Sequence, residues 1–537
     1  MKSQHRAIPG SPPRRRIGLT ALVAAAALAL AGCAGSDPAD PAGEGEEGGT
    51  LTIGLTQDVG KFDPIFSNLP TYNTFAYATP LFQTADGEFG GYLAESWELA
   101  PDSKALSFTL RDDAKFSDGT AVTADAAVAS MTRFLTTPSA KLPQYGAQIA
   151  GVSATDEFTV EIAFKIAVPQ SYAFALVNQD SAFAMITSEA GAADPDALNT
   201  ETMGAGPYVL DQAKSVSGTE YTFVPNEHYF APETRTYDEI VIKPFSDPSA
   251  LANALTSGQV TYAVSLLAPL AQQAETAGMQ LSTGALGIGD SGTAMLVFGN
   301  RTTGPLADVR VRQAIAHAIP RDDLNTSLQA GMATATSSAT PAGVGGHTGE
   351  DPFPYDVDAA KALLADAGYP DGFELTITSP SAADPGNLIG LALQSALGEI
   401  GVAVTLDRND DPFTALMGKI LGGGGFEAYV YTEPGESVFT LVTSSMTGVA
   451  PLNPNAEEIP ASVSDAIAAV AAAPAEEQDE ALADVTRAVD ELQWSTTLLS
   501  IPRLTVVQPG VTGVPASYVT AEPAPYSPNE GESWSGN

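Results

Sequence analysis

Polar and apolar residues alternate along several short stretches of the chain, and this pattern predicts β-strands with one buried face. The alternation runs through Thr50–Thr56, Leu106–Leu110 and Val160–Phe164. The pairs Asp86-Gly87 and Asp118-Gly119 flank these segments and are typical of tight turns. Short strands joined by turns are therefore expected in the first half of the chain.

A second pattern, with apolar residues three and four positions apart, predicts helices. Three stretches show it clearly: Val311–Ile319, Asp356–Ala367 and Ile389–Ile400. Asp308 and Asp356 are placed to cap the first two helices, whereas Gly368 and Gly401 end the second and the third. An alternating strand, Val402–Leu406, follows directly. Because strands and helices interleave throughout, the predicted fold class is α/β (mixed α+β).

The first 32 residues have the pattern of an export signal. Three arginines, Arg14 to Arg16, precede an uncharged apolar run at Ile17–Ala31 that is shorter than a membrane-spanning helix needs. The run closes on Leu30–Cys33, which resembles a bacterial lipobox. This resemblance implies that residues 1–32 are a lipoprotein signal peptide and that Cys33 is lipidated. An ordinary secretory signal is the alternative, and both the Sec and the twin-arginine export routes stay open.

Composition at the two ends predicts unstructured segments. Residues 33–49 are dominated by Gly, Pro, Asp, Glu and Ala, and such a stretch buries too little apolar surface to fold, so it is interpreted as a flexible spacer. A similar bias predicts a disordered tail over residues 526–537. Cys33 is the only cysteine, so the body of the chain contains no disulfide bond.

The charge of the chain excludes some classes of partner. The full chain has a net charge of −40, and residues 1–32 carry five basic and no acidic side chains, so the chain from Cys33 has 19 basic and 64 acidic side chains. A net charge of −45 argues against nucleic acid and against anionic lipid surfaces as partners. It does not define a ligand, because an acidic surface also serves solubility.

Catalytic and metal-binding patterns are absent from the sequence. Beyond residue 32 the only histidines are His228, His317 and His347, and none belongs to a zinc-protease, hydrolase-elbow or Walker motif. The glycines of Gly422–Gly425 lack the Lys-Ser/Thr pair of a phosphate loop. We therefore expect no enzyme, no cofactor and no metal site, although abundant carboxylates leave a secreted hydrolase open as an alternative.

Several blocks, in order along the chain, resemble the family 5 extracellular solute-binding proteins, the peptide, nickel and opine receptors of ABC importers. The blocks are Gly49–Leu55 with Phe62–Pro64, Leu93–Trp97, Phe108–Gly119, Gly204–Tyr208, Asn226–Phe230, Asp308–Ile315 and Ala367–Phe373. They span about residues 49 to 375. Most of them shape backbone or core, so they identify the fold better than they identify a site.

The resemblance implies a two-lobed periplasmic-binding-protein-like fold with an extra third domain and a ligand cleft between the lobes. Lobe I is expected to be discontinuous, with residues 50–91, 201–290 and 500–525. Lobe II is expected at 92–200 and lobe III at 291–499. Hinge closure around the ligand is the behaviour expected of such proteins.

The candidate ligand-binding residues lie at strand ends of lobes I and III. They are Phe62, Tyr72, Asn73, Phe75, Phe298, Asn300, Tyr431 and Glu433. In peptide-binding members of the family an acidic residue pairs with the α-amine of the ligand, and Glu433 in Tyr429–Pro434 is the nearest equivalent here, although the family's aspartate is absent. A solvated loop carboxylate is the alternative for Glu433. Aromatic residues with a few polar groups are what such a cleft needs.

The sequence thus predicts a monomeric extracytoplasmic receptor, held to the outer face of the cell membrane by a lipid. It would capture a peptide or similar small solute by hinge closure and deliver it to the permease subunits of an ABC transporter. The alternative is a non-transport ligand sensor or surface lipoprotein on the same fold. Peptides, opines, sugars and metal chelates all remain open as ligands.

Overall fold

The computed structural model describes residues 48–67, 73–139, 141–284, 292–381, 383–411, 413–423, 425–433, 437–518 and a few C-terminal positions, namely 520, 525, 527–528 and 533–536. The predicted signal peptide, the lipidation site Cys33, the ligand-binding candidate Tyr72 and most of the predicted spacer lie outside these residues. None of the helices described in the structure is both long and apolar enough to cross a membrane.

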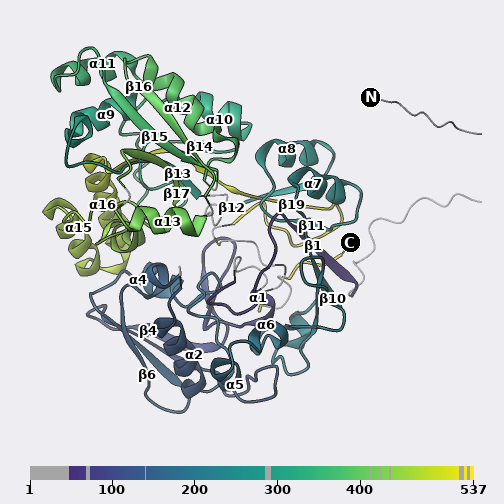
Figure 1. Ribbon diagram of the computed structural model, residues 1–537. Helices are drawn as coiled ribbons and strands as arrows, with labels where there is room; N and C mark the ends of the chain where they lie inside the picture. Colours follow the sequence, from purple (N-terminus) through teal and green to yellow (C-terminus); the bar gives the residue numbers. More distant parts are fainter. Residues whose placement is uncertain are drawn as a thin grey trace, which may run out of the picture. The chain divides into compact units, whose positions relative to one another are not determined.

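An eight-stranded sheet collects strands from three distant parts of the chain (Figure 1). Its order is β20 (Ser517–Tyr518), β12 (Gln280–Gly284), β19 (Arg503–Val507), β11 (Tyr262–Ala263), β1 (Thr50–Leu55), β10 (Glu239–Pro244), β9 (Tyr221–Pro225) and β8 (Tyr208–Leu210). Strand β1 pairs in parallel with both β10 and β11, and its buried residues Leu51, Ile53 and Leu55 confirm the alternation seen in the sequence. Helices α7 (Pro248–Thr256) and α8 (Ala268–Thr276) lie in the sequence between strands β10 and β12 of this sheet.

A four-stranded antiparallel sheet forms a second unit of structure. Its order is β4 (Ala94–Leu99), β5 (Ala105–Leu110), β7 (Thr159–Phe164) and β6 (Ile149–Ala154), and helix α2 (Ala124–Thr136) contacts β6 and β7. The strands predicted at Leu106–Leu110 and Val160–Phe164 are the two central strands, which explains why their apolar residues are buried so completely. A small hairpin, β2 (Leu81–Gln83) and β3 (Phe89–Gly91), precedes this sheet in the chain.

A six-stranded sheet occupies the C-terminal half. Its order is β14 (Thr334–Ala335), β18 (Ser495–Ile501), β13 (Gly292–Phe298), β17 (Ala428–Glu433), β15 (Glu374–Pro380) and β16 (Ala403–Asn409). One set of helices shares a core with it: α9 (Val309–His317), α10 (Arg321–Gln329), α11 (Val357–Asp366) and α12 (Leu388–Gly398). The residues of β13 and β17 on the other face pack with α16 (Gln478–Leu492) and its neighbour α15 (Ala461–Ala472). In Figure 1 both helical groups lie beside this sheet.

The helix ends follow the capping rules that the sequence suggested. Asp308 accepts a hydrogen bond from the backbone N–H of Arg310, and Asp356 accepts one from Ala359, so both aspartates cap their helices as predicted. Gly368 and Gly401, after α11 and α12, have φ angles of +92° and +85°. Only glycine adopts this region without strain, which is why both helices end there.

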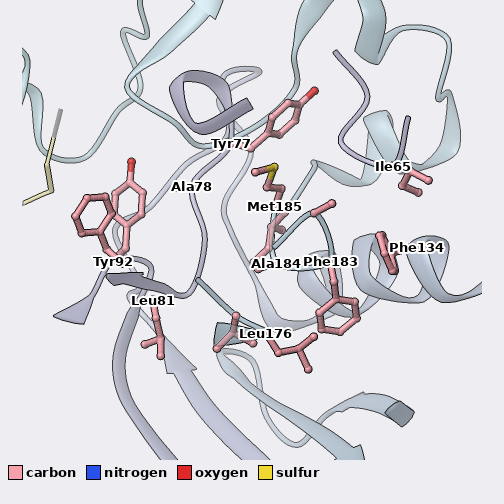
Figure 2. Close-up of a cluster of buried hydrophobic side chains, with 14 of the residues drawn as sticks. Ile65, Tyr77, Ala78, Leu81, Tyr92, Phe134, Leu176, Phe183, Ala184 and Met185 are labelled. Atoms are coloured by element: carbon pink, nitrogen blue, oxygen red, sulfur yellow. The ribbon is translucent and has the colours of Figure 1, made fainter. Parts of the chain in front are cut away.

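Two motif glycines are required by close packing. A Cβ atom on Gly372 would lie 1.9 Å from the carbonyl oxygen of Gly401, and one on Gly204 would lie 2.2 Å from that of Ala76. Tyr77, next to Ala76, belongs to the buried cluster in Figure 2, where its hydroxyl points away from Met185. In these two family-like blocks the glycine therefore allows one backbone segment to pack directly against another.

The predicted disordered tail needs correction at its very end. Residues Ser533–Gly536 are held in place, because the Trp534 side chain is only 1% exposed and its ring lies 5.1 Å from that of Tyr262. Thr512 and Ser535 also exchange backbone hydrogen bonds. The amino-acid composition predicted disorder for these residues, but burial of one tryptophan side chain stabilises their position despite the polar residues around it.

Candidate functional site

Strand β17 ends with two of the candidate ligand-binding residues, the aromatic Tyr431 and the acidic Glu433. Tyr431 and Glu433 are two positions apart, so they lie on one face of the strand, and both side chains are buried. The Glu433 Oε1 accepts a hydrogen bond of 2.5 Å from the Ser445 hydroxyl. Burial raises the pKa of the Tyr431 hydroxyl well above its usual range, and the negative charge of Glu433 raises it further. The carboxylate is thus buried and hydrogen-bonded, and it does not lie on a solvated loop.

Ser445 is a site residue that sequence reasoning missed. It lies in η5 (Leu441–Met446), a π-helix that follows the short helix α14 (Val438–Thr440) without a break. A π-helix has a wider turn than an α-helix and frequently occurs at functional sites. No residue type marks a π-helix in a single sequence, so only the structure brings Ser445 to Glu433.

The aromatic candidates of the N-terminal segment lie in the core beneath the first sheet. The rings of Phe62 and Phe75 both contact Phe223 edge-on, at 5.5 and 5.9 Å between centroids. Their side chains are 3% and 0% exposed. In this structure Phe62 and Phe75 are therefore core residues that pack against Phe223 of β9.

Asn73 has an unusual environment for a buried amide. It begins helix α1 (Asn73–Ala76), its side chain is 0% exposed, and neither its amide nitrogen nor its amide oxygen has a hydrogen-bond partner among the described residues. A buried amide without partners costs free energy, so it indicates a place where another polar group can bind. This is the feature expected of a ligand-facing residue.

The candidates at the end of β13 do not meet Glu433. Strands β13 and β17 are antiparallel, with Thr293 opposite Glu433 and Phe298 opposite Ala428. Phe298 and the nearby Asn300 therefore lie at the other end of the strand pair from Glu433. Phe298 is fully buried in the core of the six-stranded sheet. Asn300 lines a small recess of about 180 Å³ with Gly299, Gly423, Gly425, Phe426, Pro454 and Asn455.

Metal chemistry has no support in the part of the chain that the structure describes. No three His, Cys, Asp or Glu side chains within that part are grouped to hold an ion. The histidines are separate: His317 Nδ1 lies 2.7 Å from the Pro354 carbonyl oxygen, and His347 Nδ1 lies 3.0 Å from that of Thr340.

Comparison with known proteins identifies the family. The model of the bacterial extracellular solute-binding proteins, family 5 Middle, matches residues 88–432. This chain belongs to that family. The solved structures that it resembles include the periplasmic binding protein AgaA from A. tumefacien R10 in complex with agropinic acid, at 26% identity with a TM-score of 0.72, covering 88% of this chain and 96% of that one.

Other relatives place the same fold beside different ligands. The periplasmic binding protein DppA from Helicobacter pylori, in complex with the peptide STSA, has a TM-score of 0.71 at 20% identity, covering 88% of this chain and 96% of that chain. The glutathione-binding protein GsiB of Shigella flexneri is 29% identical over 321 residues. That match spans 59% of this chain and 60% of the length of GsiB. The fold is therefore that of the periplasmic binding proteins, and the matched relatives are binding proteins and not enzymes.

Proposed function

We propose that this protein is the extracytoplasmic receptor of an ABC importer and that it captures a peptide or similar small solute. The observation that carries the proposal is the buried Glu433 carboxylate, held by Ser445 at a strand end of a family 5 fold. A buried carboxylate suits a ligand with a free amino group, since the two charges satisfy each other away from water.

The three sheets are proposed to be the three lobes. The strands of the eight-stranded and four-stranded sheets lie in the segments proposed for lobes I and II, whereas β18 of the six-stranded sheet extends two residues past the proposed end of lobe III at residue 499. Strand β18 of the six-stranded sheet ends at Ile501, and β19 of the eight-stranded sheet begins at Arg503. The chain thus changes lobe through Pro502, and a short connection of this kind can act as a hinge.

The ligand is proposed to bind between lobes I and III, in contact with Glu433 and Tyr431 on one side and Asn73 on the other. Phe62 and Phe75 would act from the core of lobe I and Phe298 and Asn300 would act only on the shape of lobe III, while Tyr72, outside the described residues, remains a candidate for ligand contact. A ligand that contacts both lobes favours the closed form, because the open form offers it only half of these contacts. No cofactor and no catalytic residue is part of this proposal.

The export and anchoring of the protein follow from its N-terminus. Residues 1–32 are proposed to direct export, and lipidated Cys33 would hold the monomeric receptor on the outer face of the membrane, near the permease. Two or more acyl chains hold a protein firmly, whereas one holds it only reversibly. Mass spectrometry of the membrane fraction tests this: a diacylglyceryl modification at Cys33 supports it, and an unmodified thiol contradicts it.

A binding screen tests the receptor proposal. The purified protein is heated with single compounds from four classes: short peptides including glutathione, opines such as agropinic acid, sugars and metal chelates. A ligand that binds only the folded state adds about 2.7 kcal/mol to the free energy of unfolding at a hundredfold excess over its dissociation constant. A rise in the unfolding temperature with a class of compounds that carry an amino group supports the proposal. Uptake of that compound by cells with and without the gene then separates an importer from a sensor, which would leave uptake unchanged.

A further inference from the structure

Two segments that belong to different sheets contact each other directly. Helix α4 (Gln170–Ala175) follows the four-stranded sheet, and the rings of its Tyr172 and of Phe439 in α14 lie 5.0 Å apart. The backbone N–H of Gln170 donates a 2.9 Å hydrogen bond to Gln478 Oε1 at the start of α16. Phe439, Tyr172 and Gln478 are buried by these contacts, at 0%, 7% and 7% exposed.

An open surface groove lies beside these contacts. It has a volume of about 430 Å³, with Phe89, Trp97 and Phe174 on the side of α4 and Gln478, Asp479 and Leu482 on the side of α16. Domains of one chain are expected to move relative to each other unless the interface between them is large and apolar. The contact of α4 with α14 and α16, which includes polar groups and borders this groove, is therefore a suitable place for a separable contact between lobes.

The same contact is connected to the Glu433 side chain through one continuous helical segment. Helix α14 carries Phe439, and η5 continues it without a break to Ser445, which donates its hydroxyl to Glu433. Phe439 and Ser445 thus belong to one short helical segment, Val438–Met446. A shift of this segment that separates Phe439 from Tyr172 also changes the position of the Ser445 hydroxyl.

We propose that the Tyr172–Phe439 ring contact and the Gln170–Gln478 hydrogen bond form a latch between lobes II and III, and that Ser445 connects this latch to Glu433. The latch holds the segment Val438–Met446 in the position in which Ser445 orients the carboxylate. Its residues are positioning residues, since none of them needs to touch the ligand. The assignment of Glu433 rests on the proposed function, whereas the latch itself rests only on the contacts.

Hydrogen exchange of the ligand-free protein tests the latch. Gln478→Ala removes the acceptor of the Gln170 N–H, and Gln394→Ala is the matched control, since Gln394 donates to Val404 within lobe III. We expect the amide exchange rate in Gln170–Ala175 to rise about threefold or more in Gln478→Ala, because the variant loses one hydrogen bond. The rate should stay unchanged in Gln394→Ala. Equal exchange in the two variants would overturn the latch.

A second pair of variants tests the connection to Glu433. Ser445→Ala removes the bond to Glu433, whereas Ser444→Ala removes a hydroxyl of the same helix that donates to the Thr440 carbonyl. We expect faster exchange in Gln170–Ala175 for Ser445→Ala alone. If Ser445→Ala behaves like Ser444→Ala, the latch is not coupled to Glu433. Because no ligand is present, failure here leaves the receptor proposal standing, and a failed binding screen leaves the latch testable.

Discussion

Glu433 and Ser445, twelve positions apart, are joined by a 2.5 Å hydrogen bond at the point where strand β17 ends. The bond fixes a buried carboxylate that has Tyr431 as its neighbour on the same strand face. A buried carboxylate is stable only where hydrogen bonds or a positive charge compensate for its lost hydration. In the proposed function this carboxylate pairs with an ammonium group of the ligand, so Glu433 is the first residue to change.

Glu433→Gln keeps the shape of the side chain and removes its charge. We expect the affinity for an amino-bearing ligand to fall about tenfold or more, since a hydrogen bond between charged groups contributes about 1.5–3 kcal/mol. Titration calorimetry measures the change. Glu427→Gln is the control, because Glu427 precedes the other end of the same strand and accepts from the Thr376 N–H. Equal affinities of the two variants would show that Glu433 does not contact the ligand.

Asp490 gives the protein a predicted dependence on pH. Burial raises the pKa of Asp490 from 3.8 to about 7, although the Ala339 N–H and the Ser338 hydroxyl both donate to it. The folded state therefore holds this proton more tightly than the unfolded chain does. The contribution of Asp490 to the free energy of unfolding is fully present below about pH 4 and is lost as the pH rises to about 7. The upper limit of this contribution is roughly 4 kcal/mol.

Asp490→Asn tests this dependence. The variant keeps an acceptor and a donor for its two partners but carries no titrating group. Urea unfolding at pH 5 and pH 8 should show a smaller loss of stability for the variant than for the natural chain. The exposed Asp371→Asn serves as a control and should change nothing. An unaltered pH dependence in Asp490→Asn would contradict the assignment.

Two glycines with similar φ angles should differ in their tolerance of alanine. Gly372, at φ +79°, would place a Cβ atom 1.9 Å from the Gly401 carbonyl oxygen, whereas Gly368, at φ +92°, has open space around it. Gly368→Ala should cost about 1 kcal/mol from backbone strain alone. Gly372→Ala should cost clearly more, because backbone must move. Chemical denaturation compares the two, and equal losses would contradict the close approach.

The docked C-terminus is also open to a direct measurement. Trp534→Ala should lower the free energy of unfolding by about 3–5 kcal/mol, since the ring is buried against Tyr262. Ser535→Ala, at an exposed hydroxyl, should stay within about 0.5 kcal/mol of the natural chain. If Trp534→Ala is equally mild, the end of the chain is not held in solution.

The fold could be predicted from the sequence because its signals are local. Alternation along β1 and β5, the caps at Asp308 and Asp356 and the glycine after α12 each depend on a few neighbouring residues. Physical rules for turns, caps and periodicity apply to such short stretches directly. The order of the strands is a long-range property that these local patterns do not determine, and it is known only from the structure.

The candidate site was predictable only in part. Its acidic residue was found through the family pattern, but the partner Ser445 depends on a π-helix that has no sequence signal. Asn300 and Glu433 were both candidates at strand ends of lobe III, and the antiparallel register of β13 and β17 places them at opposite ends of the pair. Strand register depends on tertiary packing, so sequence position alone could not show which strand ends meet.

Titration calorimetry of the purified protein with peptides, opines, sugars and metal chelates tests the central claim most directly. The account predicts saturable binding of one class with a stoichiometry of about one, no chemical change of the ligand, and a loss of affinity in Glu433→Gln but not in Glu427→Gln. Conversion of the ligand to a product, or binding that is indifferent to Glu433→Gln for an amino-bearing compound, would contradict it.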